Sequence, residues 1–399
     1  MLRFVPPAGF PINVRQIWRA LKSSRATRIW PDHNLAALAP QMGVRYVNGV
    51  SSGRAALAIV LKSLHRLKPD RSIVALPAYT CFTVAASIVR AGLKIYPVDI
   101  DAEKSDFDFS QLEAVPAEKL LCIMTANLFG IVNDLARTRE IARGKGAFFV
   151  DDAAQAMGAT RNGYSSGTFG DVGIYSLGRG KALAAMEGGL VLTDSEEISS
   201  AVRSELKQVP EAARAHESWM FFQLLAYAIL LNPRLYWIPN SLPFLKLGTT
   251  EFDPNFHSFG LPKLAYGLLT ELVGSLADVN TTRRRNAAAI AKALEGVGKF
   301  STPGPARNSL PTYIRFPVIA RDQATRDMAV TQLRAAGIGA GPFYPSAICD
   351  IPGIDAYMAR SDFHQPQAED LARRLFTLPT HPLVTQADIQ RMISILNGI

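Results

Sequence analysis

The chain has 399 residues, of which 48% are apolar and 19% are charged, a composition that is typical of globular proteins and excludes a disordered chain. The formal charge of +9 favours anionic partners or simply a basic solvated surface, and the scattered Lys and Arg residues lack a nucleic-acid-binding motif, so no nucleic acid is expected. Three separated cysteines give neither a disulfide framework nor metal spacing, and Met1 to Phe10 has no signal-peptide core, so we expect a cytoplasmic protein without a metal.

The first 45 residues are expected to form an irregular arm with one short helix, Val14 to Ser23. From Val47 the pattern changes, because a small polar turn, Asn48 to Arg54, precedes apolar residues at helical spacing from Ala55 to Leu67. The start of such a helix presents free backbone N–H groups and the positive end of the helix dipole, which suits a phosphate group. Such a turn is more often an ordinary helix cap than an anion-binding site.

Strands and helices then alternate along the chain. We expect strands at Ser72–Leu76, Lys94–Ile100 and Leu120–Leu128, and helices ending near Arg90 and spanning Asp134–Lys145. This alternation predicts a mainly parallel sheet that is covered by helices on both faces.

The stretch from Phe148 to Asp194 contains three further short apolar runs. The first ends in Asp151-Asp152, the second leads from Gly173 through a Gly-Arg-Gly turn to Lys181, and the third follows Gly188-Gly189. Short apolar runs between Gly and Asp residues are typical of buried strands, and open sheets place their chemistry at strand ends. A carboxylate and an amine are therefore expected at neighbouring strand ends.

After a predicted helix at Glu196–Gln208, an apolar insert occupies about residues 217–247. Its run from Trp219 to Leu231 is too short to span a bilayer, which needs about 20 residues. Two interpretations stay open. The insert is either a buried helix or oligomer contact, or a patch that enters a membrane surface or receives a lipid chain through its aromatic residues, which are Trp219, Phe221, Phe222, Tyr236 and Trp237.

The last third of the chain is expected to begin with one long helix, Lys263 to Leu294. A strand at Thr312–Ala320, a helix at Asp322–Ala336 and a final helix from Thr385 follow. Asp388 completes a capping pattern with Thr385.

Four motifs together resemble the DegT/DnrJ/EryC1/StrS family of pyridoxal-phosphate aminotransferases, which have fold type I. They are Asp151-Asp152-Ala153-Ala154-Gln155-Ala156, Gly170-Asp171-Val172-Gly173, Ser176 with Lys181 five residues later, and Glu187-Gly188-Gly189. The resemblance implies an α/β fold with a large domain, whose mainly parallel sheet is flanked by helices, and a small C-terminal α+β domain. We expect an N-terminal arm at 1–45, a large cofactor-binding domain at 46–260, and a linking helix with the small domain at 261–399.

The resemblance also implies catalytic roles. Lys181 would form a Schiff base with pyridoxal 5'-phosphate and shuttle the proton, since a lysine in a closed site supplies both nucleophile and base. Asp152 would pair with the pyridine nitrogen and keep it protonated. This leaves Asp151 to cap the helix expected next. Gln155 would lie beside the phenolic oxygen of the ring. Ser176 and the backbone of Gly53 would hold the phosphate.

Two positions near the expected cofactor depart from the family pattern. Arg54 stands where Thr is usual, so its backbone contact is kept and its guanidinium is free to meet a phosphate. Cys81 stands where an aromatic residue stacks on the ring, with Phe82 beside it. Either side chain takes that place, or Phe82 belongs to the core.

A third departure concerns polar groups. Asn127 stands where His is frequent, so the side chain at this position does not titrate near neutral pH.

The family also takes a phosphate ligand from the partner subunit, and Asn255 and His257 are the candidates for this role here.

The predicted function is transfer of an amino group from an amino acid, with glutamate the usual donor, to a keto sugar in polysaccharide or glycoconjugate biosynthesis. The enzyme would be a homodimer with active sites at the interface. Relatives with His in place of Lys181 perform dehydration, so the lysine favours amine transfer. The alternatives are a lipid-linked or acyl-carrier-bound carbonyl as acceptor, with membrane association, and a non-catalytic regulator that binds the cofactor.

Overall fold

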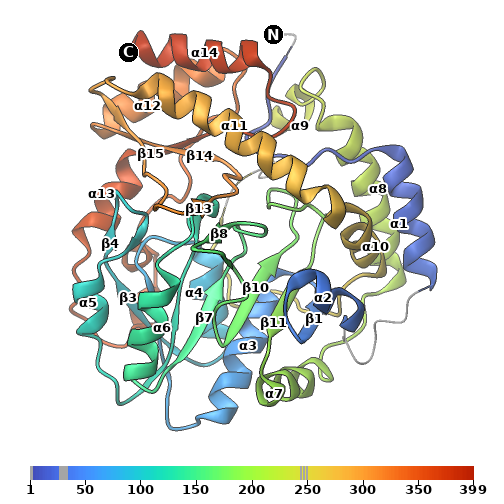
Figure 1. The fold of residues 1–399 in the computed structure, drawn as a ribbon, viewed down its shortest axis with the longest axis vertical. Helices are drawn as coiled ribbons and strands as arrows, with labels where there is room; N and C mark the ends of the chain where they lie inside the picture. Colours follow the sequence, from blue (N-terminus) through green and yellow to red (C-terminus); the bar gives the residue numbers. More distant parts are fainter. Residues whose placement is uncertain (1–2, 27–34, 243–244, 246–247, 249) are drawn as a thin grey trace.

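A seven-stranded sheet in the order β1-β11-β10-β7-β6-β2-β3 is the centre of the computed structural model, which describes residues 3–26, 35–242, 245, 248 and 250–399 (Figure 1). Its strands are β1 (Tyr46–Val50), β2 (Ile73–Pro77), β3 (Lys94–Val98), β6 (Leu120–Met124), β7 (Phe148–Asp152), β10 (Val172–Ser176) and β11 (Gly189–Thr193). Strands β3, β2, β6, β7 and β10 pair in parallel, and β11 runs antiparallel to β1 and β10. The predicted α/β fold with a mainly parallel sheet is confirmed.

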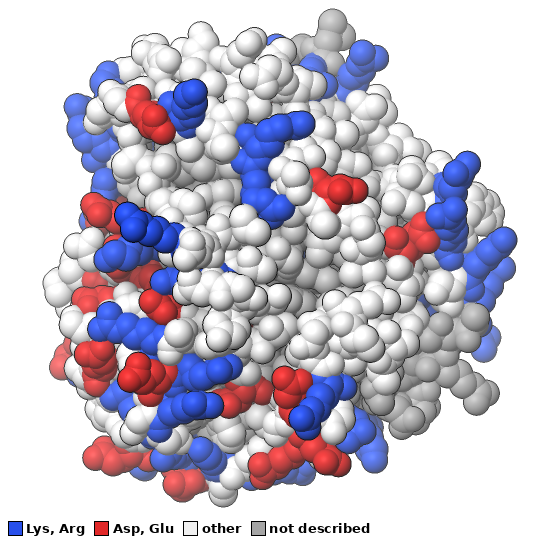
Figure 2. Space-filling model, viewed as in Figure 1, with Lys and Arg blue, Asp and Glu red and all other residues white. Residues whose placement is uncertain are grey.

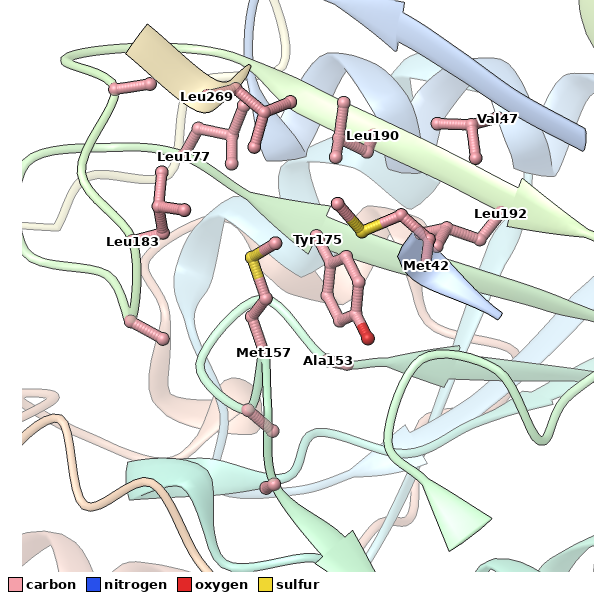
Figure 3. Packing of buried hydrophobic residues seen from close by; sticks show 14 of the residues in the cluster. Met42, Val47, Ala153, Met157, Tyr175, Leu177, Leu183, Leu190, Leu192 and Leu269 are labelled. Carbon is pink, nitrogen blue, oxygen red and sulfur yellow. The ribbon is translucent and has the colours of Figure 1, made fainter. Parts of the chain in front are cut away.

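Each strand sends alternate side chains to the two faces of the sheet. One face packs against α3 (Gly53–Leu67), α4 (Phe82–Arg90) and α7 (Glu196–Leu206). The other packs against α2 (Ala39–Met42), α6 (Leu135–Gly144) and α10 (Lys263–Leu272). Figure 3 shows this second layer, where side chains of β1, β10 and β11 meet Met42, Met157 and Leu269. Because both faces are covered, the strands are mostly apolar, and most of their polar residues lie at strand ends.

A second sheet, β12 (Phe300–Ser301), β14 (Phe316–Ala320) and β15 (Leu375–Leu378), lies beyond the first in the chain. It forms a separate core with α11 (Leu276–Leu294), α12 (Gln323–Ala335), α13 (Pro366–Arg374) and α14 (Gln386–Asn397). The predicted capping pattern at the last helix is present, since the Thr385 side chain and the Asp388 carboxylate each accept a backbone N–H of the other residue. The domain boundaries at 45 and 260 stay predictions.

The described chain contains further α-helices and strand pieces. They are α1 (Val14–Ala26), α5 (Phe109–Glu113), α8 (Arg214–Leu230), α9 (Trp237–Asn240), and the strand pieces β4 (Ile100–Asp101), β5 (Asp106–Phe107), β8 (Thr160–Arg161), β9 (Tyr164–Ser165) and β13 (Ser309–Leu310). Within the residues that the structure describes, no helix has both the length and the apolar character needed to cross a membrane.

Several predicted elements differ from the structure. Asn48 to Val50, expected in a polar turn, belong to β1, and the strand expected over Lys94–Ile100 is interrupted at Asp99 between β3 and β4. The long helix is divided into α10 and α11 by a single 3-10 turn at Val273–Ser275, where a β-branched residue and Gly274 are both poor helix formers. The strand from Leu120 ends at Met124, because Asn127 has a left-handed backbone with φ +37°. The strand expected from Thr312 begins at Phe316, after Tyr313 with φ +46°.

Candidate functional site

Strands β7 and β10 bring Asp152 and Lys181 to the same edge of the sheet. Asp152 is the last residue of β7 and pairs with Ile174 of β10, which ends two residues later at Ser176. Lys181 follows in a turn that its N–H closes on the Gly178 carbonyl at 3.0 Å. A Cβ atom built on Gly178 would lie 3.8 Å from Lys181 Cγ and 3.9 Å from Ser176 Oγ. The lysine stem and the serine hydroxyl therefore both border Gly178.

Asp152 is a buried carboxylate, and its Oδ1 accepts the N–H of Ala154 at 2.9 Å. Burial raises its pKa to about 6, against the lowering effects of that hydrogen bond and of the nearby Lys181 ammonium. A buried anion of this kind is stabilised by a cationic partner. The carboxylate therefore fits a protonated ring nitrogen.

Asp151 has a different role from the one expected. We expected it to cap a helix after β7, but the residues that follow form turns, so no free helix N–H group is present there. Its carboxylate instead accepts from Asn127 Nδ2 at 2.7 Å, from Gly167 N–H at 2.6 Å and from Thr125 Oγ1 at 3.4 Å. Asn127 also donates to the Asp152 carbonyl at 2.9 Å. This network fixes the strand end that carries Asp152.

Gln155 is held on both sides of its amide. Its Oε1 accepts the Phe129 N–H at 2.8 Å, and its Nε2 donates to the Tyr344 hydroxyl at 2.9 Å. Burial is the main cause of the raised pKa of Tyr344, and Cys81 and Asp152 are close enough to raise it further. Tyr344 therefore belongs to the site, and the sequence interpretation missed it. No local motif marks it, because its contact with Gln155 spans 189 positions.

The backbone at the start of α3 lies against the Ser176 side chain at the end of β10. A Cβ atom on Gly53 would lie 2.8 Å from Ser176 Cβ and 3.0 Å from Ser176 Oγ. The Ser52 side chain caps the helix by accepting the Ala55 N–H at 3.2 Å. A helix N-terminus and a hydroxyl thus meet at one point, as a bound phosphate requires.

Arg54 directs its guanidinium onto the Phe256 ring, 4.8 Å from the centroid, and Arg90 lies over the same ring at 4.5 Å. The neighbours of that ring, Asn255 and His257, are exposed. In the described chain, no hydrogen bond joins their side chains to the Asp152 and Lys181 cluster. Their expected role belongs to a partner subunit and stays a prediction.

Cys81 and Phe82 are separated by the start of α4. Cys81 is the N-cap residue, its Sγ lies 3.0 Å from Thr83 Oγ1, and it lies beside Tyr344. Phe82 is buried in the apolar layer between α3, α4 and the sheet. The side chain next to the cluster is thus the thiol, and Phe82 belongs to the core.

Together these groups match the needs of pyridoxal phosphate. Lys181 supplies an amine, Asp152 a buried carboxylate for the pyridine nitrogen, and the Gly53 and Ser176 contact a cradle for the phosphate. The residues present therefore fit this cofactor.

Comparisons with known proteins agree with this geometry. The sequence pattern of the DegT/DnrJ/EryC1/StrS aminotransferase family matches residues 32–220 and 262–397. A UDP-N-acetyl-3-dehydro-alpha-D-glucosamine 3-aminotransferase from Acidithiobacillus ferrooxidans is 27% identical over 90% of this chain and 86% of its own length. A GDP-4-keto-6-deoxy-D-mannose 3-dehydratase from Yersinia pseudotuberculosis is 34% identical, over only 40% of this chain and 42% of its own length.

Among solved structures, the Helicobacter pylori aminotransferase PseC, involved in the biosynthesis of pseudoaminic acid, superimposes with a TM-score of 0.79. The match covers 99% of this chain and 98% of that one, at 14% identity, and so shows the shared fold. The chain belongs to the DegT/DnrJ/EryC1/StrS aminotransferase family, and it is a transaminase with pyridoxal phosphate as its cofactor.

Proposed function

We propose that this enzyme transfers an amino group from glutamate to the ketone of a nucleotide-linked sugar, in the biosynthesis of a glycan. The observation that carries the proposal is the placement of Lys181 beside the buried Asp152 at one sheet edge. The UDP-sugar aminotransferase that aligns with 90% of the chain supports the substrate class.

The protein's own groups divide the work. Bound pyridoxal phosphate supplies an electron sink for the charge left when a carbon beside the amine loses its proton. Lys181 removes and returns that proton through Nζ, and its turn beside Gly178 keeps the stem close to Ser176. Asp152 holds the proton on the pyridine nitrogen, which keeps the sink effective. The Gln155 amide, fixed by Phe129 and Tyr344, keeps the ring oriented.

Phosphate binding falls to backbone and hydroxyl groups. The first N–H groups of α3, from Gly53 and Arg54, have no partner within the helix, and the Ser176 hydroxyl lies against them. These contacts orient the cofactor without consuming a titratable group.

Absorbance spectroscopy tests the first half of the reaction. The purified protein with pyridoxal phosphate should show the band of a lysine-bound cofactor, and adding glutamate should convert it to the band of the aminated cofactor. A UDP- or GDP-linked keto sugar should then restore the first band. Binding without any change on adding amino acids would favour the non-catalytic regulator instead.

Replacing Asp152 by Asn tests the electrostatic role. The amide oxygen still accepts the Ala154 N–H, so the turn after β7 should persist. The pyridine nitrogen loses its anionic partner, and the rate of the glutamate half-reaction should fall by about a hundredfold or more. Stopped-flow absorbance measures this rate, and cofactor retention is the control. A rate within a few-fold of the wild type would remove Asp152 from this role.

The proposal includes a homodimer in which Asn255 or His257 of one subunit reaches the phosphate of the other. Exposure of both side chains in the single chain supports this arrangement. Single alanine variants at the two positions, titrated with pyridoxal phosphate, should show weaker cofactor binding for one of them only. If the two variants bind pyridoxal phosphate with the same affinity, this arrangement is contradicted.

A lipid-linked carbonyl acceptor is the second candidate, and contacts of α8, most of which lies in the insert, with the Lys181 loop favour it. The Tyr227 hydroxyl of α8 donates to the Arg179 carbonyl at 3.4 Å, and His216 bonds to Glu187 at 2.5 Å. Helix α8 thus borders the loop that carries the catalytic amine. The two acceptors are distinguished by comparing the turnover of one keto sugar in its nucleotide-linked and its lipid-linked form. Faster turnover of the lipid-linked form would favour the second candidate.

A further inference from the structure

Apart from the last two residues, two segments lie outside the stretches that match the family, residues 1–31 and 221–261. The first contains α1, and the second contains α9 and most of α8. Eleven large apolar side chains are exposed in the described part of the chain, and eight of them lie in or beside these segments: Val14, Trp18, Trp219, Phe222, Ile229, Trp237, Leu242 and Leu245. Exposed apolar surface is thus concentrated where this chain departs from its family.

Helix α8 is apolar on two opposite sides. Its inner side buries Met220 and Leu224 in the core. Its outer side carries a stripe at positions that recur on one helix face, namely Trp219, Phe222, Ala226 and Ile229. The three large members are 60%, 61% and 59% exposed. A helix with two apolar sides is expected to be covered on both.

No carboxylate interrupts the outer side of α8. Residues 218 to 245 contain no Asp or Glu. Glu217, at the start of the helix, instead caps α10 by accepting the N–H groups of Lys263 at 2.6 Å and Leu264 at 3.3 Å. Its charge is therefore directed to the dipole of another helix and away from the stripe.

Helix α1 adds cations to this apolar surface. Val14 and Trp18 are 65% and 63% exposed. The helix has no acidic residue, and its basic side chains, all exposed, are Arg15, Arg19, Lys22 and Arg25. Only Arg19 is in an ion pair among the described residues, with Glu271 at 3.2 Å. In Figure 2, basic side chains line the edge where Figure 1 places α1.

Both helices pack on α10 and lie on the same side of the molecule (Figure 1). The chain just before α1 is tied to α8, since the Phe10 N–H donates to the Tyr227 hydroxyl at 3.0 Å. We call the exposed residues of α1 and the outer side of α8 with α9 the α1/α8 surface.

We propose that the α1/α8 surface binds an anionic phospholipid bilayer. Its tryptophans and aliphatic side chains enter the interfacial region, and the cations of α1 contact the headgroups. Helix α8, about 25 Å long at 1.5 Å per residue, lies in the plane of the membrane. A second copy is the less favoured occupant, because a two-fold contact would bring the α1 cations of two chains together. The proposal does not rest on the proposed sugar acceptor.

Vesicle sedimentation of the full chain tests it. The protein should bind vesicles of phosphatidylcholine mixed with phosphatidylglycerol, and bind phosphatidylcholine alone at least about tenfold more weakly. The chain's four tryptophans are Trp18, Trp30, Trp219 and Trp237, of which three belong to the α1/α8 surface. Binding should therefore shift the intrinsic fluorescence to shorter wavelength.

Two paired variants locate the surface. Trp219→Ser with Phe222→Ser should lower binding by more than about tenfold, and Arg15→Gln with Lys22→Gln should lower it by roughly tenfold and weaken its dependence on salt. The matched controls remove two exposed apolar side chains, Leu310→Ser with Met328→Ser, or two exposed cations, Lys62→Gln with Lys207→Gln. Neither control should change binding.

Analytical ultracentrifugation tests whether a second copy of the chain, and not a membrane, covers the α1/α8 surface. The proposal predicts that Trp219→Ser with Phe222→Ser leaves the oligomeric state and the far-UV circular dichroism unchanged. A wild-type protein that binds neither kind of vesicle would overturn it. So would a variant that dissociates into monomers while vesicle binding is unaffected.

Discussion

Gly53 permits the contact on which the proposed phosphate binding depends. Any side chain there meets Ser176, since the added Cβ would lie 2.8 Å from Ser176 Cβ. Gly53→Ala should move α3 away from β10 and weaken pyridoxal phosphate binding by about tenfold or more. Gly144→Ala is the matched control, because a Cβ there meets nothing within 4 Å. Equilibrium titration of the cofactor measures both affinities, and equal losses in the two variants would contradict the cradle.

Residues that lie within a local motif could be picked out from the sequence. Asp152, Ser176 and Lys181 were assigned because their motifs resemble those of the family, and the structure brings them to one edge, while their roles stay predictions. Tyr344 was missed because only the folded chain brings it to Gln155. The role of Asp151 was wrong for the same reason, since its partners Asn127 and Gly167 come from other loops.

At the scale of elements, the cap of α14 provides a quantitative test. The Thr385 side chain accepts the Asp388 N–H at 3.2 Å, and the Asp388 carboxylate accepts the Thr385 N–H at 2.9 Å. Thr385→Ala should lower the free energy of unfolding by about 1 kcal/mol. Thr281→Ala, inside α11 and exposed, should change it by less than about 0.5 kcal/mol. Urea denaturation followed by circular dichroism measures both free energies of unfolding. Similar losses in the two variants would contradict a stabilising role for the cap.

Most helices and strands could be predicted because hydrophobic periodicity is a local signal. Except for β1, the strands of the central sheet begin within about two residues of the expected positions, as do α3 and α6. Strand β1 was missed because its Asn48 and Gly49 are typical of a turn. The break at Val273–Ser275 was missed because apolar spacing continues through it, while the helix changes to a 3-10 turn at weak helix formers. The strand after Leu120 was predicted too long because the left-handed backbone of Asn127 leaves no pattern in the sequence.

At the scale of the whole molecule, the N-terminal arm joins the two cores through a buried histidine. His381 Nε2 donates to the Pro6 carbonyl at 2.8 Å, and its Nδ1 accepts the Leu383 N–H at 3.3 Å. Burial lowers the pKa of His381 to about 4. The pKa of His381 is lower in the folded state than in the unfolded state. The contribution of the buried, neutral imidazole to stability is therefore present above about pH 6.5 and is lost as the pH falls through 4.

His381→Gln tests this linkage, because its side chain stays uncharged at low pH. Between about pH 7 and pH 4 the wild type should lose up to about 3 kcal/mol more stability than the variant. The buried Asp106, Asp151 and Asp152, whose pKa values burial raises, favour folding as the pH falls in both proteins and cancel in the comparison. Thermal melts across this pH range measure the stability of both proteins. If stability depends on pH in the same way in both, the role given to His381 is contradicted.

The account depends most on the identity of the residue that holds the cofactor. The measurement is borohydride reduction of the protein loaded with pyridoxal phosphate, followed by digestion and mass spectrometry of the labelled peptide. The account predicts a single reduced cofactor adduct on Lys181. A label on a different lysine, or bound cofactor that borohydride fails to fix to the chain, would contradict it.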